Sequence, residues 1–238
     1  MSILSSLLCS ELLNDNAGFS LWLTVKVMLV TMLCHCVAGI SLGYCLSQPK
    51  FPAQRWLDLL VTMPLVFPPV ATGFALLMLF GKQSFLGQAF INNGFSLIFT
   101  FQGLVLASFI SGLPLVVKPV QNAMAQLTRR WSEVARTLGK KEWEIMLFVL
   151  LPNIRHALMT GLMLSAGRSL GEVGITLMLG GNITGKTNTI SLEIYNAVFS
   201  GEYQRALWLS LILACFSILI FTTLRHYSSG GQQPWNPS

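Results

Sequence analysis

Long apolar stretches separated by short polar segments dominate the chain. A helix needs about 20 predominantly apolar residues to cross the hydrocarbon core of a bilayer, and five of these stretches meet that length or approach it. The expected spans are residues 19–47, 56–80, 97–117, 156–179 and 207–224. The pattern predicts an all-α integral membrane protein with about five transmembrane helices.

The composition agrees with this prediction. Of the 238 residues, 53% are hydrophobic and 10% are charged, and the mean hydropathy is +0.63. A soluble domain of this size carries more charge. The net charge of +6 does not indicate nucleic-acid binding, because the basic residues are sparse and their placement is better explained as a topology signal.

The five cysteines are odd in number and show no paired spacing, so they predict neither a disulfide framework nor a metal site. The triplet Cys34-His35-Cys36 lies inside the first span. Neighbours one and two positions apart on a helix point in different directions and cannot converge on one metal. We expect these three residues to fill space in the span.

Lys26, about two turns into the same span, is expected to reach the membrane interface with its long side chain.

The second span carries the segment MPLVFPPVATGF, which contains several residues that disrupt helices. These residues are Pro64, Pro68, Pro69 and Gly73. In lipid, a broken backbone survives only where protein buries it or where it lines a wet cavity. The span is therefore expected to face the interior or a translocation pathway, with a packing kink as the simpler alternative.

The fourth span contains GRSLGEVG. Gly167 and Gly171 form a small-xxx-small pair that would permit close helix approach. Arg168 and Glu172 are four residues apart on one helical face, placed to form an ion pair near the bilayer centre. Two interpretations stay open: the pair belongs to a gate or the wall of an anion pathway, or it is a buried pair that fixes helix packing.

The longest polar interruption runs from Glu133 to Pro152. Ser132 is suited to cap the start of a short helix, and Gly139 is suited to end it. A second helix is expected to follow until Pro152 removes a backbone donor. The segment is expected to dock another protein.

The spacing of five residues in this segment resembles the EAA loop of ABC importer permeases. These residues are Glu133, Ala135, Gly139, Leu151 and Pro152. Val134 and Val149 depart from the family pattern, but both keep an apolar residue of similar shape. The resemblance implies a cytoplasmic coupling segment, 133–152, that contacts a separate ATPase subunit and includes Arg136.

A wider resemblance covers residues 21–224. MPLVFPPVATGF, LFGKQSFLG, VARTLG and GRSLGEVGITLMLGGNITGKTNTISLEIY together resemble molybdate permease subunits of ABC importers. Tungstate and sulfate/thiosulfate permeases are the alternatives within this class. The resemblance implies a type I ABC importer permease fold with short cytoplasmic coupling helices, in a bacterial inner membrane. It also implies a homodimer that works with two cytoplasmic ATPase subunits and a periplasmic oxyanion-binding protein. No catalytic residue, metal or cofactor is expected in this chain, since ATP and Mg would bind the ATPase.

The distribution of basic residues predicts the topology. With the N-terminus outside and the C-terminus inside, ten basic residues fall in cytoplasmic segments, three in external loops and two in spans. The cytoplasmic ten are Lys50, Arg55, Lys118, Arg129, Arg130, Arg136, Lys140, Lys141, Arg155 and Arg225. We expect an N-terminal periplasmic or interfacial segment (1–18), a membrane domain (19–226) and a cytoplasmic tail (227–238).

Three other interpretations have less support from the sequence. GGNITGKT (180–187) matches the Walker A pattern, but it follows a membrane span instead of a strand and lies outside in the predicted topology, so ATP binding there is rejected. An ion-coupled secondary transporter could use Arg168 and Glu172 as a relay, although no internal repeat is visible. A membrane-embedded enzyme has no convergent cluster of reactive side chains to support it.

Overall fold

The computed structural model describes residues 15–48, 53–127, 144, 148 and 150–229. Within these ranges every regular element is a helix. The elements are α2 (Asp15–Ser47), α3 (Gln54–Val66), α4 (Pro69–Phe80), α5 (Phe85–Asn92), α6 (Phe101–Leu127), α9 (Leu151–Leu170), α10 (Gly174–Gly180), α11 (Ile190–Phe199) and α12 (Tyr203–Ser229). The prediction of an all-α fold is confirmed.

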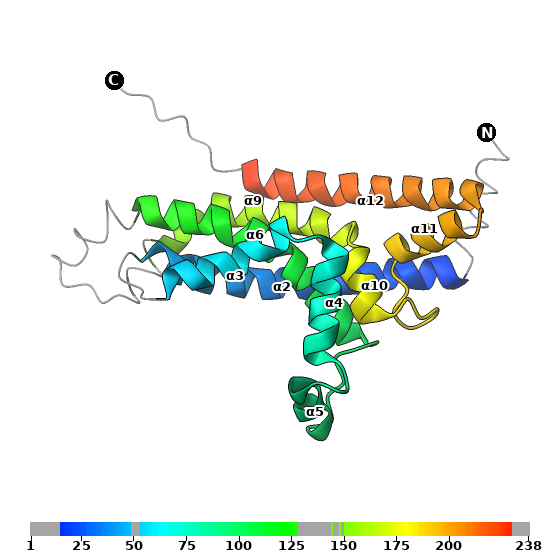
Figure 1. The fold of residues 1–238 in the computed structure, drawn as a ribbon. Coiled ribbons are helices and arrows are strands. Elements are labelled where there is room, and N and C mark those ends of the chain that lie inside the picture. The colour runs from blue at the N-terminus through cyan, green and yellow to red at the C-terminus, as the bar shows by residue number, and fades with distance from the viewer. Residues whose placement is uncertain (1–14, 49–52, 128–143, 145–147, 149, 230–238) are drawn as a thin grey trace.

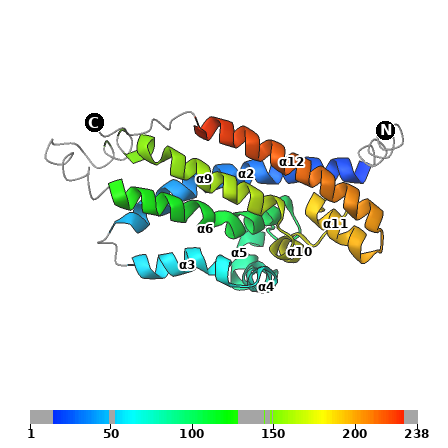
Figure 2. The ribbon, with the colours of Figure 1, turned by 90° about the horizontal axis from the view of Figure 1, so that it is seen from above.

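Four long helices, α2, α6, α9 and α12, run side by side as a bundle (Figures 1 and 2). The most extensive contacts join α6 to α2 and to α9. Between α6 and α9 the core consists of aliphatic side chains: Val116, Val120, Met124, Ile154, Leu158 and Leu162. α12 lies along α9 and is largely exposed, as expected for a helix whose apolar surface faces lipid.

Glycines allow α2 and α9 to approach α6 closely. A Cβ at Gly39 would lie 2.5 Å from Val116 Cγ1, and a Cβ at Gly43 would lie 2.6 Å from Val120 Cγ1. Gly161 on α9 is equally close to α6, 2.8 Å from the Val116 Cα. These contacts advance by four residues on both α2 and α6, so the two helices run parallel in a fixed register.

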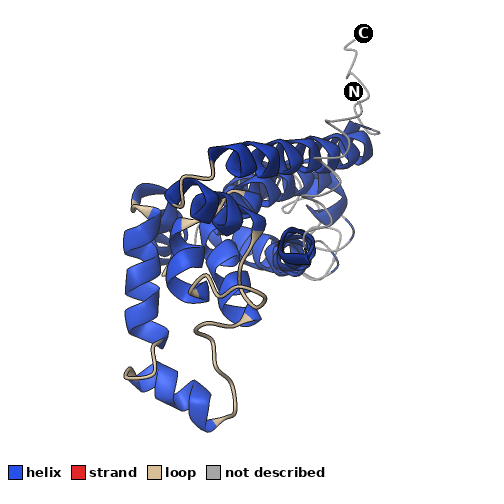
Figure 3. Ribbon diagram, turned by 90° about the vertical axis from the view of Figure 1, so that its right-hand side faces the viewer, coloured by secondary structure: helices blue, strands red, loops and turns tan. Residues whose placement is uncertain are grey.

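The predicted second span is divided. α3 lies along the bundle, whereas α4 stands across it and leads to α5, which projects from the bundle (Figures 1 and 3). The helix ends before Phe67 and Pro68, which have extended backbones with ψ angles of 141° and 135°. A residue that precedes proline is disfavoured in helical conformation, so the Pro68-Pro69 pair separates the helices. Pro64, by contrast, stays inside α3.

The predicted fourth span is also divided. α9 ends at Leu170, and α10 follows after a bend of 63°. The expectation of one helix over 156–179 was therefore wrong. Three helices are long and apolar enough to cross a membrane, and the bent pairs α4–α5 and α9–α10 raise the number to five within the described residues. The count of about five agrees with the sequence, but the second span is α4–α5 by this criterion, not residues 56–80.

The third span was placed correctly but ends later than predicted. α6 continues past Lys118 to Leu127. Lys118 Nζ donates a hydrogen bond to the carboxylate of Asp58 on α3, so the lysine charge is paired inside the folded chain. α12 contains the predicted fifth span, 207–224, and extends it at both ends.

Two shorter helices, α5 and α11, lie between the long ones. The Ser84 hydroxyl caps α5 by accepting a 2.9 Å hydrogen bond from the Gly87 N–H. The N-terminal segment before Asp15, most of the coupling segment and the last nine residues lie outside the described residues.

Candidate functional site

The ends of α6 and α9 mark where the predicted coupling segment leaves the bundle. α6 ends at Leu127 and α9 begins at Leu151, both at the same end of the molecule (Figure 1). Pro152 occupies the first turn of α9, where a missing N–H costs no hydrogen bond within that helix. The described residues just before it, Phe148 and Leu150, are π-helical, so the helix type changes next to this proline. The other predicted coupling residues, Glu133, Ala135, Arg136 and Gly139, lie outside the described residues.

The two broken helices meet each other. A Cβ at Gly73 on α4 would lie 2.9 Å from the Ile175 Cα on α10. In the same way, a Cβ at Gly174 would lie 2.8 Å from the Pro69 Cβ. We call this contact the α4–α10 junction. Two segments that the sequence identified separately, more than 90 residues apart, thus form one site, and Gly174 is the residue of GRSLGEVG whose packing role the sequence did not reveal.

The predicted ion pair lies beside this junction. Arg168 Nη2 is 3.2 Å from Glu172 Oε2, so the pairing four residues apart is confirmed. The Glu172 side chain is 1% exposed, and that of Arg168 is 37% exposed. Glu172 Oε1 also accepts a 2.8 Å hydrogen bond from the Ile175 N–H. The carboxylate therefore caps the first turn of α10 and binds back to the last turn of α9, across the bend.

Within this single chain, Gly167 and Gly171 make no close approach to another helix. A Cβ at Gly167 would meet nothing within 4 Å, and a Cβ at Gly171 would meet only the Gly167 carbonyl oxygen, at 3.8 Å. Gly171 instead ends α9. The close contact on α9 is made by Gly161, two turns earlier, because that face of the helix is the one turned towards α6.

His35 is more than space-filling, which corrects the sequence interpretation. Its Nε2 lies 2.9 Å from the Phe109 carbonyl oxygen on α6, and its Nδ1 lies 2.7 Å from the Ser165 hydroxyl on α9. A carbonyl only accepts, so Nε2 donates, and in the neutral ring Nδ1 accepts from Ser165. The ring lies on Gly112 and stacks with Phe109. His35 thus joins three helices in the buried interior, and within the described residues no group of His, Cys, Asp or Glu could hold a metal.

A second polar cluster lies at the opposite end from the coupling segment, and the sequence did not reveal it. Glu193 on α11 is buried, and its Oε1 is 2.6 Å from Arg205 Nη2 on α12. Arg205 also pairs with Glu202 at 3.1 Å, and Asn188 donates to the other Glu193 oxygen. These contacts connect α11 and α12. The sequence did not predict the pair of Glu193 and Arg205, because the two residues are twelve positions apart and lie on different helices.

The segment that matches the Walker A pattern has a structural role instead. It follows helix α10, not a strand. The Thr187 hydroxyl donates to the Gly180 carbonyl at 2.6 Å and accepts from the Ile183 N–H at 3.0 Å. Thr187 is fully buried, so its hydroxyl closes this turn, in agreement with the rejection of a nucleotide site.

Several known proteins are similar to this chain. The family model described as "Binding-protein-dependent transport system inner membrane component" matches residues 36–227. The molybdenum transport system permease protein ModB of Azotobacter vinelandii is 36% identical over 219 residues, 91% of this chain and 96% of that protein. ModB of Escherichia coli K12 is 32% identical, over 91% of this chain and 97% of that protein. The sulfate transport system permease protein CysW of Synechocystis is 30% identical, over 87% of this chain and 75% of that protein.

The fold is also similar to a solved structure. A chain of the MetNI methionine ABC transporter, in an inward-facing conformation, superposes with a TM-score of 0.69 at 15% identity. The match covers 92% of this chain and 97% of that chain. With the family model covering most of the sequence, this chain belongs to the binding-protein-dependent transport system inner membrane components, and it is a multi-pass protein of the inner membrane.

Proposed function

We propose that this chain is the transmembrane subunit of an ATP-driven importer that moves molybdate across the inner membrane. The similarity to two ModB proteins over nine-tenths of the chain is the observation that carries the proposal. Sulfate is the second candidate substrate, because CysW is 30% identical. Both are tetrahedral dianions, so the same kind of pathway would serve either, and tungstate as well.

Arg168 is proposed to contact the oxyanion as it passes. Its guanidinium is permanently charged and carries five N–H donors, and its side chain is partly exposed beside the α4–α10 junction. Glu172 neutralises part of this charge. A passing dianion would then be attracted without being held tightly, which transport requires, since a substrate that binds too strongly does not leave.

α9 is proposed to connect the motor to this pathway. It begins at Leu151 and Pro152, the last residues of the coupling segment, and carries Arg168 in its last turn. At 1.5 Å per residue, the 17 steps from Leu151 to Arg168 span about 25 Å. A displacement of the coupling segment by the ATPase would move this helix as one body and reach the α4–α10 junction.

The proposed complex contains two copies of this chain, two cytoplasmic ATPase subunits and a periplasmic oxyanion-binding protein. ATP and Mg would bind the ATPase, and this chain would hold no cofactor and catalyse no reaction.

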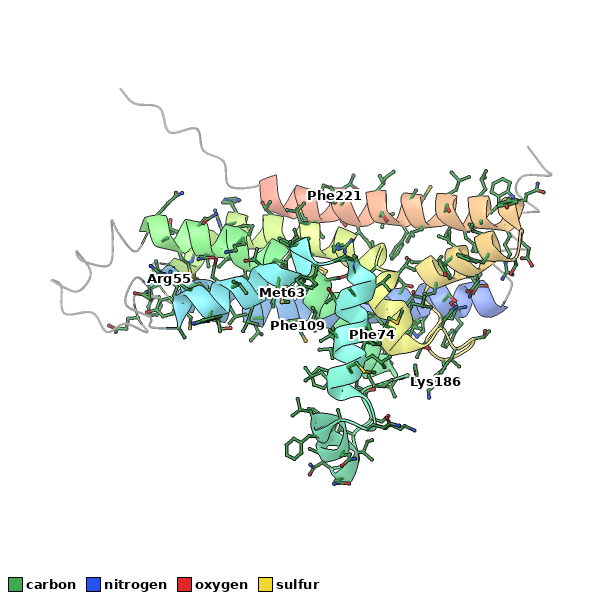
Figure 4. All side chains as sticks on the ribbon, viewed as in Figure 1. Arg55, Met63, Phe74, Phe109, Lys186 and Phe221 are labelled. Atoms are coloured by element: carbon green, nitrogen blue, oxygen red, sulfur yellow. The ribbon has the colours of Figure 1, made fainter. Side chains whose placement is uncertain are left out.

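Large apolar side chains of the α4–α5 arm, including Phe74, Met78 and Phe85, are exposed and would suit contact with a second copy. The labels in Figure 4 place Arg55 and Lys186 towards opposite ends of the molecule, as the proposed topology, with Arg55 inside and Lys186 outside, requires.

Reconstitution in vesicles tests the proposal. The chain is combined with its ATPase and binding protein, and uptake of radiolabelled molybdate is measured with and without ATP, in competition with tungstate and sulfate. We expect ATP-dependent uptake that unlabelled molybdate suppresses best. Uptake driven by a proton gradient, or by the chain without companions, would show a secondary transporter. Stronger suppression by sulfate would reassign the substrate and leave the transport class intact.

A further inference from the structure

Lys26 carries its charge in the middle of the membrane-spanning part of the chain. Two neighbours of Lys26 on α2 pack against α12: Ala17 with Leu209, and Met28 with Phe216. These contacts put Lys26 level with the middle of the apolar span Tyr203–Leu224. The middle of a bilayer is about 15 Å from either surface, further than the four-carbon stem of a lysine extends. The expectation that Lys26 reaches the membrane interface therefore does not hold.

No acidic side chain in the described part of the chain neutralises this charge. Lys26 is exposed, and its Nζ lies 5.0 Å from the centre of the Phe101 ring on α6. The ring face attracts a cation but carries no net charge. Among the described residues, no carboxylate forms an ion pair with Lys26. Charged side chains within a membrane almost always face a bundle interior or a water-filled cavity, so this ammonium group needs water or an anion beside it.

A second copy of the chain would bring the same carboxylates, and these already have partners. The described ion pairs join Asp58 to Lys118, Glu172 to Arg168, and both Glu193 and Glu202 to Arg205. Asp15, at the start of α2, comes eleven residues before Lys26, about 16 Å along the helix axis. The counter-charge of Lys26 is therefore expected to come from a molecule other than this chain.

Lys26 lies at the same depth as the ion pair of Arg168 and Glu172. Ala166 and Leu170, on either side of Arg168, pack with Met28 in one cluster. The opposite charges of Arg168 and Glu172 offset each other, so Lys26 leaves one uncompensated positive charge per chain at this depth. Two copies would carry two such charges, which equals the charge of a tetrahedral dianion.

The position of Lys26 around the bundle favours the space between two copies. Val30 and Cys34 follow Lys26 at intervals of one turn on α2, and together with Phe109 on α6 they line an apolar groove. Figure 4 shows Phe109 on the side of the bundle from which α4 and α5 project. The α4–α5 arm is the part proposed above to contact a second copy. A water-filled route between the copies would thus have Lys26 in its wall.

We infer that Lys26 lines the translocation route and pairs with the oxyanion in the middle of the membrane, as a second cationic contact besides Arg168. This inference rests on the proposed function. The ammonium group donates as a compact point charge and lacks the bidentate geometry of a guanidinium. It would attract the dianion without fixing its orientation, so the anion could move on to the next contact.

Restoring the charge chemically tests the inference. In a variant whose five native cysteines are serine, Lys26→Cys is reconstituted with the ATPase and the binding protein, and uptake of radiolabelled molybdate is measured. We expect uptake to fall about tenfold, on the order of the effect of a lost hydrogen bond to a charged group. Aminoethyl methanethiosulfonate, which adds a positive charge to the new thiol, should restore uptake. The neutral methyl reagent should not, whereas a purely structural role would not depend on the charge of the reagent.

A second measurement reports on the route without relying on transport. The new thiol should react with the anionic sulfonatoethyl methanethiosulfonate, and molybdate should slow this reaction because it occupies the same place. Ile218→Cys is the control, since Ile218 is exposed on α12, between residues that pack at the level of Met28. If it faces lipid, as expected for α12, its thiol should stay unreactive.

Variants that keep the native cysteines provide an independent check. Lys26→Arg should retain uptake and Lys26→Gln should lose it, whereas Lys82→Gln, an exposed change between α4 and α5, should have no effect. Full uptake by Lys26→Gln, recovery of Lys26→Cys by the neutral reagent, or an unreactive thiol at this position would overturn the inference. Absence of molybdate uptake by the wild-type chain would instead count against the proposed function.

Discussion

Gly73 on α4 lies against Ile175 on α10 so closely that an added Cβ would stand 2.9 Å from the Ile175 Cα. The obstacle is backbone, which cannot move aside as the end of a flexible side chain can. The two helix breaks of the chain therefore depend on each other, since α4 can cross α10 only at a residue without a side chain. Glu172, which pairs with Arg168, accepts a hydrogen bond from the Ile175 N–H at this contact.

Gly73→Val should separate α4 from α10. The added side chain must displace backbone, and overpacking of this kind costs about 1–3 kcal/mol. We expect a lower midpoint of thermal unfolding in detergent and reduced uptake in vesicles. Gly167→Ala is the matched control, because a Cβ at Gly167 meets nothing within 4 Å and alanine favours a helix. If both variants behave alike, the close contact at Gly73 is unimportant.

Arg168→Ala should reduce uptake at least tenfold, on the order of the effect of a lost hydrogen bond to a charged group, while the yield of assembled protein stays close to normal. Assembly is expected to survive because Glu172 keeps its hydrogen bond to the Ile175 N–H without Arg168. Glu172→Ala removes both the pair and this cap, so it should lower the assembled yield. Uptake and yield are measured on the same preparations. Loss of assembled protein in Arg168→Ala would favour the packing role over the pathway role.

Glu133→Lys, or a change of Gly139 to valine, should leave the protein in the membrane but abolish stimulated ATP hydrolysis and uptake. The proposed reason is that the coupling segment no longer fits the ATPase. Phosphate release by the reconstituted complex is the measurement, and Lys186→Gln, an exposed change at the other end of the molecule, is the control. Undiminished transport in the first two variants would remove the coupling role.

His35→Ala should destabilise the bundle by about 2–5 kcal/mol, because it leaves a cavity and an unpaired Ser165 hydroxyl. Ser165→Ala should cost about 1–3 kcal/mol, since the ring nitrogen then lacks its partner. Unfolding in denaturant is followed by Trp fluorescence. Ser41→Ala serves as control, because this exposed hydroxyl bonds only within its own helix, and it should change stability by less than about 0.5 kcal/mol. Equal stability of His35→Ala and the control would show that the three-helix link contributes little.

Cysteine labelling tests the proposed topology. In a variant without native cysteines, Lys186→Cys should react with a membrane-impermeant maleimide added outside intact cells, and Lys140→Cys should react only after the membrane is opened. The distribution of ten basic residues against three is the reason for this expectation. The reverse pattern would place the coupling segment outside, where no ATPase could reach it.

Features that depend on local chemistry could be predicted from the order of the amino acids alone. Hydropathy identified the apolar helices, and the Pro68-Pro69 pair predicted a break because proline lacks an N–H and constrains the residue before it. The four-residue spacing of Arg168 and Glu172 predicted their ion pair, because residues four apart lie next to each other on one face of a helix. Motif spacing was sufficient to identify the family, which the matches to residues 36–227 confirm.

The contacts between distant segments could not be predicted and are known from the folded structure. Lys118 ends the apolar stretch of the sequence, yet α6 continues past it, and its charge is paired with Asp58, 60 residues away. Within the chain, Gly161 and not Gly167 packs closely against α6, because Gly161 is on the face turned towards that helix. His35 is bound by partners 74 and 130 residues away. The neighbours of a residue along the chain determine whether it lies in a helix. The contacts that give these residues their structural roles come from other helices, and the local spacing of residues does not predict where those helices lie.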